Sequence, residues 1–352
     1  MRILHLIHST HVGGVESAAA HLREELADHE RIQYRIAVLA AADPDQAVLT
    51  ADVAGSGLNS PLSALAVLRQ IRRWDPDVLV TSLWRSVAVG ALARALGRRR
   101  PWAIWVHNSR FTQPVDRLVH HWALPRADLV LCDSIAARDL LAEPILRRAG
   151  ARHPAVLVRP DAAPLPAHTA AAPALRAQLR LVTWGRIAPQ KRLDVALGIL
   201  AQLREQSPAG AHLTIIGPDS GGLADLRAEI IRRRLADAVT LTGPADRAAI
   251  ARAAAEADVF IQTSEFEGYA MAAHEALAAG MVSLLTPVGD LASDTRDGDH
   301  ALHHHGDAAR SAARLLELAE DPAAWAEMSH RARHVRTTAM ADEFAAACEV
   351  LA

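Results

Sequence analysis

Lysine is almost absent from this chain of 352 residues. Of its 38 basic residues only Lys191 is a lysine, and the rest are arginines. A bias toward arginine codons explains the surplus of arginine but not the one lysine that persists. Lysine carries a compact charge on a flexible stem, whereas arginine is a planar fork. A site that needs a point charge beside phosphate would keep its lysine, so Lys191 is a candidate functional residue. Chance survival is the alternative.

Cysteine and long apolar runs are also scarce. The two cysteines, Cys132 and Cys348, lie far apart and give no disulfide framework, which favours a reducing cytoplasm. No stretch approaches the roughly 20 apolar residues of a transmembrane helix, and the apolar run in MRILHLIHST is too short for a signal peptide. We therefore expect a cytoplasmic protein. Its net charge of −2 gives no sign of a nucleic-acid binder.

The length and the apolar pattern predict two α/β domains. The chain suits two domains of roughly 150 residues each, and a hydrophobic content of 51% supplies material for two cores. Short apolar runs alternate with segments of helical apolar spacing, which indicates parallel sheets with helices on both faces. The predicted strands are 3–7, 34–39, 77–81, 102–107, 128–132, 155–159, 180–184, 212–216, 238–242, 258–262 and 282–285. The predicted helices include 15–28, 63–74, 193–205, 223–234, 248–257, 270–279, 322–335 and 341–351.

A stretch with several prolines, residues 163–175, interrupts this alternation and predicts a linker. The chain then divides into an N-terminal domain (1–162) and a C-terminal domain (176–335), followed by a helical segment (336–352). The predicted fold is two doubly wound, Rossmann-like domains that face each other across a cleft. Such sheets bind ligands at the carboxyl ends of their strands, so the cleft is the expected site.

Two glutamates flank a predicted strand-to-helix turn. Glu267 follows the strand 258–262, Gly268 permits a tight backbone, and Glu275 lies in the next helix. Free amides at a helix N-terminus suit an anionic or polyhydroxyl ligand, and carboxylates accept hydrogen bonds from sugar hydroxyls. A solvated loop glutamate beside an ordinary helical glutamate is the alternative.

A second motif, WGRIAPQKRLD, also joins a strand to a helix and carries Arg186 and Lys191. These two cations could converge on a diphosphate and neutralise a leaving group without a metal ion. No zinc motif, phosphate-binding loop or nucleophile elbow is present, so we expect no metal and no cofactor. We expect His300, His303, His304 and His305 to lie at the surface, because consecutive histidines do not converge on a metal by themselves.

Weaker signals follow other strands. Gly13 and Gly14 permit a close approach of backbone to ligand at the start of a helix, although a Gly-Gly pair also forms plain turns. His107 ends a strand and would face the cleft, although a packed or surface histidine is the common case. Gly217 and Gly243 lie in loops after strands, where ordinary turns also use glycine.

Together these motifs resemble the retaining family 4 glycosyltransferases, also called glycosyl transferases group 1. Glu267 and Glu275 match the E-x7-E signature of that family. Gly185, Arg186 and Lys191 match its G-R-x4-K pattern, and the Gly13-Gly14 loop is similar to its G-G-x-E loop. The resemblance implies the two-domain B-type glycosyltransferase fold, in which the last helix (336–352) crosses back to the N-terminal domain.

The resemblance also implies residue roles. Glu267 would contact hydroxyls of the donor sugar, Glu275 the ribose, Lys191 and Arg186 the diphosphate, and His107 the sugar and the developing positive charge. Turn amides would support the sugar and phosphate, and two glycine loops would lie near the base; these residues are Gly268, Tyr269, Ala270, Met271, Gly217 and Gly243. Ala270 departs from the family, which often has a glycine there, so the pocket could be narrower.

The implied activity is retaining, metal-independent transfer of a hexose from a nucleotide-diphosphate sugar. The acceptor would be a glycan, a lipid-linked saccharide or a small molecule. A nucleotide-sugar epimerase of the same fold and a non-catalytic partner subunit are the alternatives.

Arginines cluster in two places of the N-terminal domain. One cluster is Arg69, Arg72 and Arg73, and the other, beside Trp102, is Arg94, Arg98, Arg99 and Arg100. Such clusters suit peripheral contact with an anionic inner membrane face, or simply a solvated basic face.

Overall fold

The structure is a computed structural model that describes residues 1–10, 13–41, 49–97, 99–111, 113–161, 165–168, 178–335 and 339–351. Contacts divide the chain into two compact units. Unit 1 comprises Met1–Asp161 and Thr338–Ala352, and unit 2 comprises Ala162–Thr337. Most of the predicted linker 163–175 lies outside the described residues, as do His11 and Arg98.

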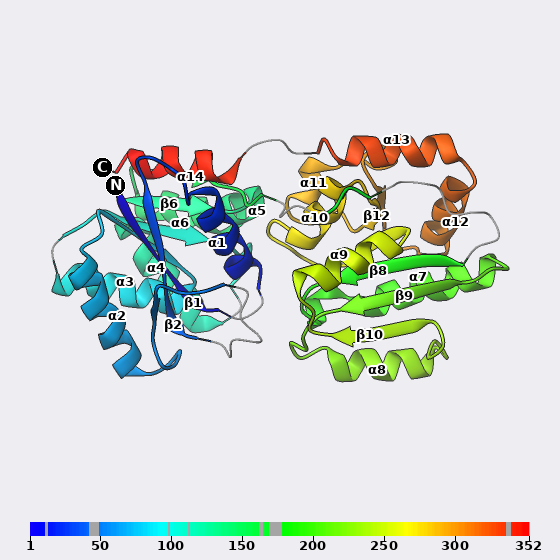
Figure 1. The fold of residues 1–352 in the computed structure, drawn as a ribbon, viewed down its shortest axis with the longest axis horizontal. Coiled ribbons are helices and arrows are strands. Elements are labelled where there is room, and N and C mark those ends of the chain that lie inside the picture. The colour runs from blue at the N-terminus through cyan, green and yellow to red at the C-terminus, as the bar shows by residue number, and fades with distance from the viewer. Residues whose placement is uncertain are drawn as a thin grey trace. The chain divides into compact units, whose positions relative to one another are not determined.

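Unit 1 is built on a seven-stranded parallel sheet with the strand order β3-β2-β1-β4-β5-β6-β7 (Figure 1). Its strands are β1 (Arg2–Ser9), β2 (Gln33–Ala40), β3 (Val53–Ala54), β4 (Val78–Ser82), β5 (Trp102–Val106), β6 (Leu129–Cys132) and β7 (Ala155–Leu157). Its helices are α1 (Gly14–Glu25), α2 (Pro61–Trp74), α3 (Trp84–Leu96), α4 (Pro114–Ala123), α5 (Ile135–Ala137), α6 (Glu143–Ala149) and α14 (Met340–Glu349), with a 3-10 turn at Leu124–Arg126 and a π turn at Arg138–Ala142.

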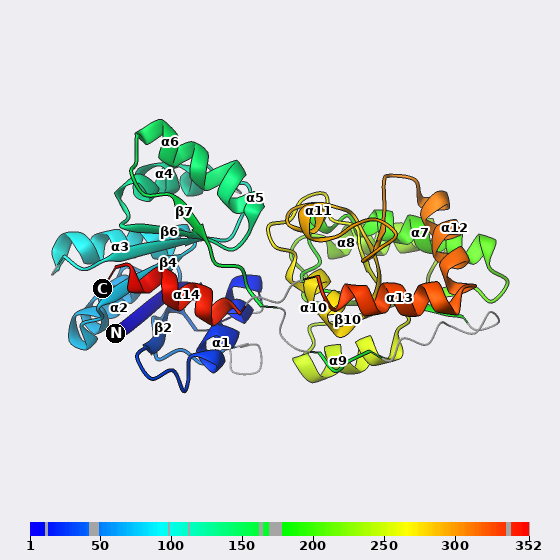
Figure 2. The ribbon, with the colours of Figure 1, turned by 90° about the horizontal axis from the view of Figure 1, so that it is seen from above.

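Apolar side chains on both faces of this sheet produce two separate cores. Neighbouring residues of β1 belong to different cores, because successive side chains of a strand point to opposite faces. Leu4 packs in the core that α2, α3 and α4 cover, and Ile3 packs in the core that α1 and α14 cover. The C-terminal helix α14 thus packs within unit 1, where Figure 2 shows it beside α1, and it buries Met340 and Phe344 there.

Unit 2 repeats the arrangement with a six-stranded parallel sheet of order β10-β9-β8-β11-β12-β13. Its strands are β8 (Leu179–Trp184), β9 (Ala211–Ile216), β10 (Val239–Gly243), β11 (Val259–Gln262), β12 (Val282–Leu285) and β13 (Leu302–His303). Its helices are α7 (Leu193–Gln206), α8 (Leu223–Arg232), α9 (Arg247–Glu256), α10 (Met271–Ala279), α11 (Leu291–Asp294), α12 (Ala308–Ala319) and α13 (Pro322–Ala332), with a 3-10 turn at Pro189–Lys191. Leu181 and Val182 of β8 again belong to opposite cores.

The predicted fold class is confirmed: each unit is a doubly wound, Rossmann-like α/β sheet. Every predicted strand is present, and the sequence analysis missed only β3 and β13. These two strands have two residues each, which is too short for an apolar pattern to emerge.

The strand orders place one switch point in each sheet. In unit 1 the chain winds outward from β1 through β2 on one side and through β4 on the other. In unit 2 the central strand is β8, with β9 on one side and β11 on the other. Open α/β sheets bind ligands in the crevice beyond the carboxyl ends of the two strands at such a point.

Candidate active site

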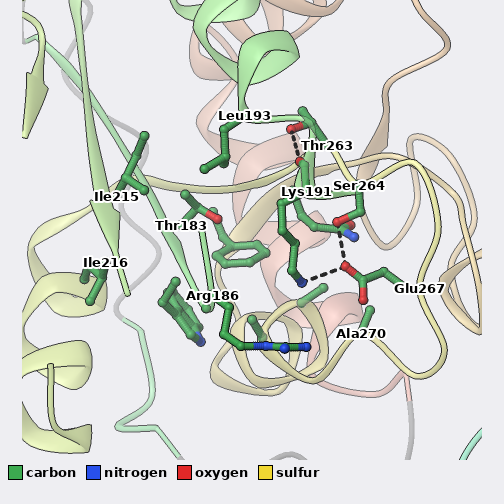
Figure 3. A pocket seen from close by; sticks show the side chains of 16 residues that line it. Thr183, Arg186, Lys191, Leu193, Ile215, Ile216, Thr263, Ser264, Glu267 and Ala270 are labelled. Atoms are coloured by element: carbon green, nitrogen blue, oxygen red, sulfur yellow. Dashed lines mark hydrogen bonds and ion pairs between the residues drawn. The ribbon is translucent and has the colours of Figure 1, made fainter. Parts of the chain in front are cut away.

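A pocket of unit 2 lies at its switch point, beyond the carboxyl ends of β8 and β11. Residues on both sides of the two strand ends line it, including Trp184, Arg186, Lys191, Gln262, Ser264, Glu267 and Ala270 (Figure 3). The glutamate turn and the arginine-lysine loop of the sequence analysis therefore share one pocket, although they are about 80 residues apart in the chain.

Lys191 and Glu267 form the centre of this pocket. The Nζ atom of Lys191 lies 2.7 Å from Oε1 of Glu267, and the Ser264 hydroxyl donates to the same carboxylate oxygen at 2.6 Å (Figure 3). The two side chains are only 24% and 13% exposed. The pair is therefore partly shielded from water, where opposite charges interact more strongly than at the surface.

Backbone hydrogen bonds hold the two loops together. The Thr263 hydroxyl donates to the carbonyl oxygens of Lys191 and Arg192 at 3.2 and 2.9 Å. The backbone N–H of Glu265 donates to the carbonyl of Gln190 at 2.8 Å. Because these bonds involve main-chain atoms and one short side chain, they fix the position of the Lys191 backbone relative to the Glu267 loop.

Arg186 brings a second positive charge to the pocket. It follows β8 and is exposed, and Figure 3 places its guanidinium group on the same side as the Lys191 ammonium. Within the part of the chain that the structure describes, the Arg186 guanidinium forms no ion pair with an acidic side chain. Its charge and that of Lys191 are therefore both available to an anion in the pocket.

Glu275 is held by side chains from two other elements. The indole N–H of Trp184 donates to Oε2 at 2.8 Å, and Arg247 of α9 donates to Oε1 at 3.2 Å. The Glu275 carboxylate is buried, so these donors stabilise its charge. Glu275 is not among the residues that line the pocket, but its partner Trp184 is.

The turn between Glu267 and α10 has an unusual backbone. Ala270 is the N-cap residue of α10 with φ of 62°, in the left-handed region that costs a residue with a side chain about 1–2 kcal/mol. Tyr269 is buried and stacks on His274 with ring centroids 4.0 Å apart, and Nε2 of His274 in turn lies 3.1 Å from Oδ2 of Asp294. The stack and this hydrogen bond hold the turn in its conformation.

The two weaker glycines of unit 2 meet at the same sheet edge. The backbone N–H of Gly217 donates to the carbonyl of Gly243 at 2.8 Å. Gly217 has φ of 150°, and a Cβ atom there would lie 1.9 Å from the carbonyl oxygen of Gly185. Packing of the backbone against Gly185 thus accounts for a glycine at 217, whatever else that loop does.

Gln262 is a pocket residue that the sequence analysis missed. It ends β11 and is 6% exposed, and among the described residues neither its amide nitrogen nor its amide oxygen has a hydrogen-bond partner. Buried polar groups are nearly always paired, so this amide is available to a ligand. The only signal in the sequence is one polar residue at the end of the apolar run VFIQ.

Unit 1 has its own cavity, of about 200 Å³, at the carboxyl ends of β1, β4 and β5. Its lining includes His8, Trp84, Arg85, His107, Asp116 and His120. His107 therefore faces a cavity, as expected from its place at a strand end. Gly13 is the N-cap of α1 and Gly14 its first residue, and neither lines this cavity.

Both ring nitrogens of His107 lie within hydrogen-bonding distance of protein atoms. Nδ1 is 3.2 Å from Oδ2 of Asp133, and Nε2 is 2.8 Å from the Ser82 hydroxyl. The side chain is 4% exposed. Asp133, which follows β6, is thus the residue that pairs with His107.

Two expectations from the sequence are wrong. His303 and His304 are buried rather than at the surface, because they extend β13 into the sheet and bond to the hydroxyls of Thr295 and Ser311 at 2.8 Å each. Trp102 is 1% exposed, since it lies in β5, an interior strand between β4 and β6, and so it cannot reach a membrane. Arg100 beside it is also buried and pairs with Asp75 at 2.6 Å.

Among the described residues, no helix is both long enough and apolar enough to cross a membrane. Two groups of side chains have the spacing of metal ligands, Asp297, His303 and His305 in unit 2, and His21, Glu25 and Asp161 in unit 1. Asp297 in the first group already pairs with Arg314 at 2.8 Å. Neither group includes a residue of the pocket in unit 2.

Comparisons with known proteins agree with this geometry. A model of glycosyl transferases group 1 matches residues 178–321, and a model of glycosyltransferase family 4 matches residues 12–149. Over 116 residues the chain is 38% identical to a D-inositol 3-phosphate glycosyltransferase of Jonesia denitrificans, which is 32% of this chain and 27% of that protein. Over 120 residues it is 32% identical to a GDP-mannose:cellobiosyl-diphosphopolyprenol alpha-mannosyltransferase of Komagataeibacter xylinus, 34% of this chain and 30% of that protein. These matches thus span less than a third of each curated relative.

Solved structures of the B-type fold are similar over the whole chain. Anabaena HepE, in complex with UDP and glucose, superposes with a TM-score of 0.79 at 19% identity, covering 100% of this chain and 99% of that one. Sucrose-phosphate synthase from Thermosynechococcus elongatus gives a TM-score of 0.74 at 19% identity, covering 99% and 97%. With a family model matching each half, the chain belongs to the family 4 glycosyltransferases (glycosyl transferases group 1), and its two Rossmann-like units are those of the B-type fold.

Proposed function

We propose that this protein is a retaining glycosyltransferase that transfers a hexose from a nucleotide-diphosphate sugar to an acceptor. The observation that carries the proposal is the grouping of Arg186, Lys191 and Glu267 in one pocket at the switch point of unit 2. Two cations suit the diphosphate, and a carboxylate suits the hydroxyls of the sugar. HepE, which has the same fold, was solved with UDP and glucose.

In the proposed reaction, Arg186 and Lys191 stabilise the departing diphosphate as its charge develops. Glu267 holds the sugar, and it also anchors Lys191 until the phosphate competes for that ammonium. Glu275, set by Trp184 and Arg247, binds the ribose. A phosphate oxygen of the donor takes the proton of the acceptor on the leaving-group side, so the acceptor attacks from that same face and the anomeric configuration is retained.

Two alternatives use the same pocket. A nucleotide-sugar epimerase would release an altered free sugar, and a non-catalytic partner subunit would bind no donor or leave it unchanged. The presence of both acids and both cations argues against the non-catalytic subunit. A thermal-shift screen with UDP-, GDP- and ADP-sugars separates binding from no binding, because a ligand of the folded state raises its stability by mass action. Transfer of the sugar to an acceptor then excludes the epimerase.

We further propose that the reaction needs no metal ion, because the two cations can neutralise the diphosphate. Transfer should persist in excess chelator. Complete loss of activity that manganese or magnesium restores would contradict the proposal.

The stereochemistry of transfer has its own test. Proton NMR of the first product from an α-linked donor should show an α-linkage, and a β-linkage would contradict retention.

The acceptor is proposed to be a glycan, a lipid-linked saccharide or a small molecule. The proposed location is the cytoplasm, where the buried free thiols of Cys132 and Cys348 would stay reduced.

Peripheral membrane contact of unit 1 would use α4 rather than Trp102. This helix exposes Val115, Leu118 and Trp122 at 39%, 70% and 49% beside exposed Arg117. Anionic vesicles should retain the protein at low salt and lose it with Leu118→Glu; failure to bind would end the membrane proposal.

A further inference from the structure

A buried chain of hydrogen bonds crosses the sheet of unit 1, passes through His107 and ends at Asp133. Tyr34 on β2 lies 2.6 Å from Nδ1 of His5 on β1, and Nε2 of His5 lies 2.7 Å from the Ser82 hydroxyl on β4. Ser82 in turn lies 2.8 Å from Nε2 of His107, whose Nδ1 lies 3.2 Å from Asp133. The chain thus links three neighbouring strands, β2, β1 and β4, with the loops that follow β5 and β6, and the ring of His107 lines the cavity.

The protons of this chain can be assigned from its end at Asp133. An ionised carboxylate only accepts, and its other oxygen already accepts from the Ser134 hydroxyl at 2.9 Å. Nδ1 of His107 must therefore carry a proton. When His107 is neutral, its Nε2 accepts from Ser82, Ser82 accepts from Nε2–H of His5, and Nδ1 of His5 accepts from the Tyr34 hydroxyl.

His5 itself is neutral, because burial and the nearby His107 lower its pKa to about 3. Its ring therefore carries one proton, which lies on Nε2 toward Ser82, and its Nδ1 is left to accept from Tyr34.

An aromatic layer supports the chain and includes the C-terminal helix. His5 and His107 lie against Trp105 with ring centroids 5.6 and 5.2 Å away. Phe344 of α14 stacks on Trp105 at 5.4 Å and meets the edge of Tyr34 at 5.8 Å. Because these rings are packed on both sides, neither histidine can turn away from its partners without opening the core.

We infer that Tyr34, His5 and Ser82 are positioning residues that fix the ring of His107 at the cavity and hold it in the tautomer with its proton on Nδ1. The inference rests on the proposed function only in what it says about sugar transfer. Both nitrogens of the His107 ring are hydrogen-bonded to the protein, so the ring does not present a free nitrogen to the sugar. Other charged or titratable groups at the same cavity are His8, Arg85, Asp116 and His120, and Asp133 faces the ring directly.

The test reads the tautomer of His5 by NMR of the full-length protein with labelled histidine, assigned by single substitutions. At a pH well above the ordinary histidine range, the ring proton of His107 should lie on Nδ1 and that of His5 on Nε2. In Ser82→Ala the preference of His5 for Nε2 should be lost, because its acceptor there is removed. A wild-type His5 with its proton on Nδ1 would overturn the inference.

Activity gives a second, matched comparison. Ser82→Ala should lower the kcat of transfer about five- to tenfold, the value of one hydrogen bond, with little change in KM for the donor. Ser86→Ala is the control, because the hydroxyl of this buried serine has no hydrogen-bond partner among the described residues. Equal kcat in the two variants would refute positioning. If Ser82→Ala does not fold, Tyr34→Phe, which removes the hydrogen bond at the other nitrogen of His5, replaces it. A wild-type protein with the expected tautomers but no transfer from any nucleotide sugar would instead refute the proposed function alone.

Discussion

The Nζ atom of Lys191 lies 2.7 Å from Oε1 of Glu267, a contact between loops that follow β8 and β11. The only lysine of the chain thus pairs with the first acid of the E-x7-E motif. Both side chains are largely shielded, so each depends on the other for compensation of its charge. A diphosphate that draws Lys191 away would leave Glu267 to the sugar hydroxyls and to Ser264.

Replacement of Lys191 should therefore reduce transfer strongly. A charge-assisted contact to phosphate is worth about 1.5–3 kcal/mol, so Lys191→Ala should lower kcat/KM about ten- to a hundredfold. Lys191→Arg should also reduce it, because a planar fork cannot occupy the position of the ammonium beside Glu267. Arg232→Ala is the control, since this exposed arginine pairs only with Glu229 at the surface. Full activity of Lys191→Arg would contradict a specific need for lysine.

Trp184→Phe should destabilise unit 2 and weaken donor binding, because it removes the indole N–H that donates to buried Glu275. A hydrogen bond to a charged group contributes about 1.5–3 kcal/mol to the free energy of unfolding. Trp325→Phe is the matched control, since the indole N–H of Trp325 is buried without a partner. A double-mutant cycle with Glu275→Gln measures the coupling by chemical denaturation. Equal losses for the two tryptophans would show that the bond contributes nothing.

Ala270→Gly should raise the free energy of unfolding by about 1 kcal/mol, because φ of 62° strains alanine and not glycine. The same change at Ala272, inside α10, should instead cost about 0.5–1 kcal/mol. Opposite signs in urea unfolding are the expected result. If Ala270→Gly is also destabilising, the left-handed backbone at this turn is not the native one.

Gln262→Met should leave the free energy of unfolding unchanged or raise it by up to about 1–3 kcal/mol, since it removes a buried amide that has no partner. Gln202→Met on α7 is the control, where a surface change should stay within about 0.5 kcal/mol. We also expect the thermal shift that a nucleotide sugar produces to shrink in Gln262→Met. An unchanged shift would mean that the donor does not use this amide.

The stability of unit 1 should fall as pH drops from about 6.5 toward 3. Burial lowers the pKa of His5 to about 3 and that of His8 to about 4, so between these values and about 6.5 the unfolded chain binds more protons than the folded one. Each histidine then contributes a slope of up to about 1.4 kcal/mol per pH unit. His5→Phe should flatten the curve of unfolding free energy against pH relative to wild type. An unchanged slope would mean that His5 does not titrate on unfolding.

The two α/β sheets and the charged residues of the pocket could be predicted from local patterns along the chain. A strand that is buried on both faces of its sheet is apolar along its whole length, so it is visible as an apolar run in the sequence. Every strand longer than two residues was predicted in this way. Lys191, Arg186 and Glu267 were found because each belongs to a short motif at a strand end, where the fold brings loops together.

The pairing of side chains across those loops could not be predicted, because it depends on how the strands are arranged in the fold. Asp133 beside His107, Trp184 beside Glu275 and the chain from Tyr34 to Ser82 join residues from different strands. The unpaired state of Gln262 is likewise a property of its surroundings. The burial of Trp102, His303 and His304 also depends on which strand lies next to which. Local patterns cannot carry this information, because a hydrogen-bond partner or a burying neighbour can lie anywhere along the chain.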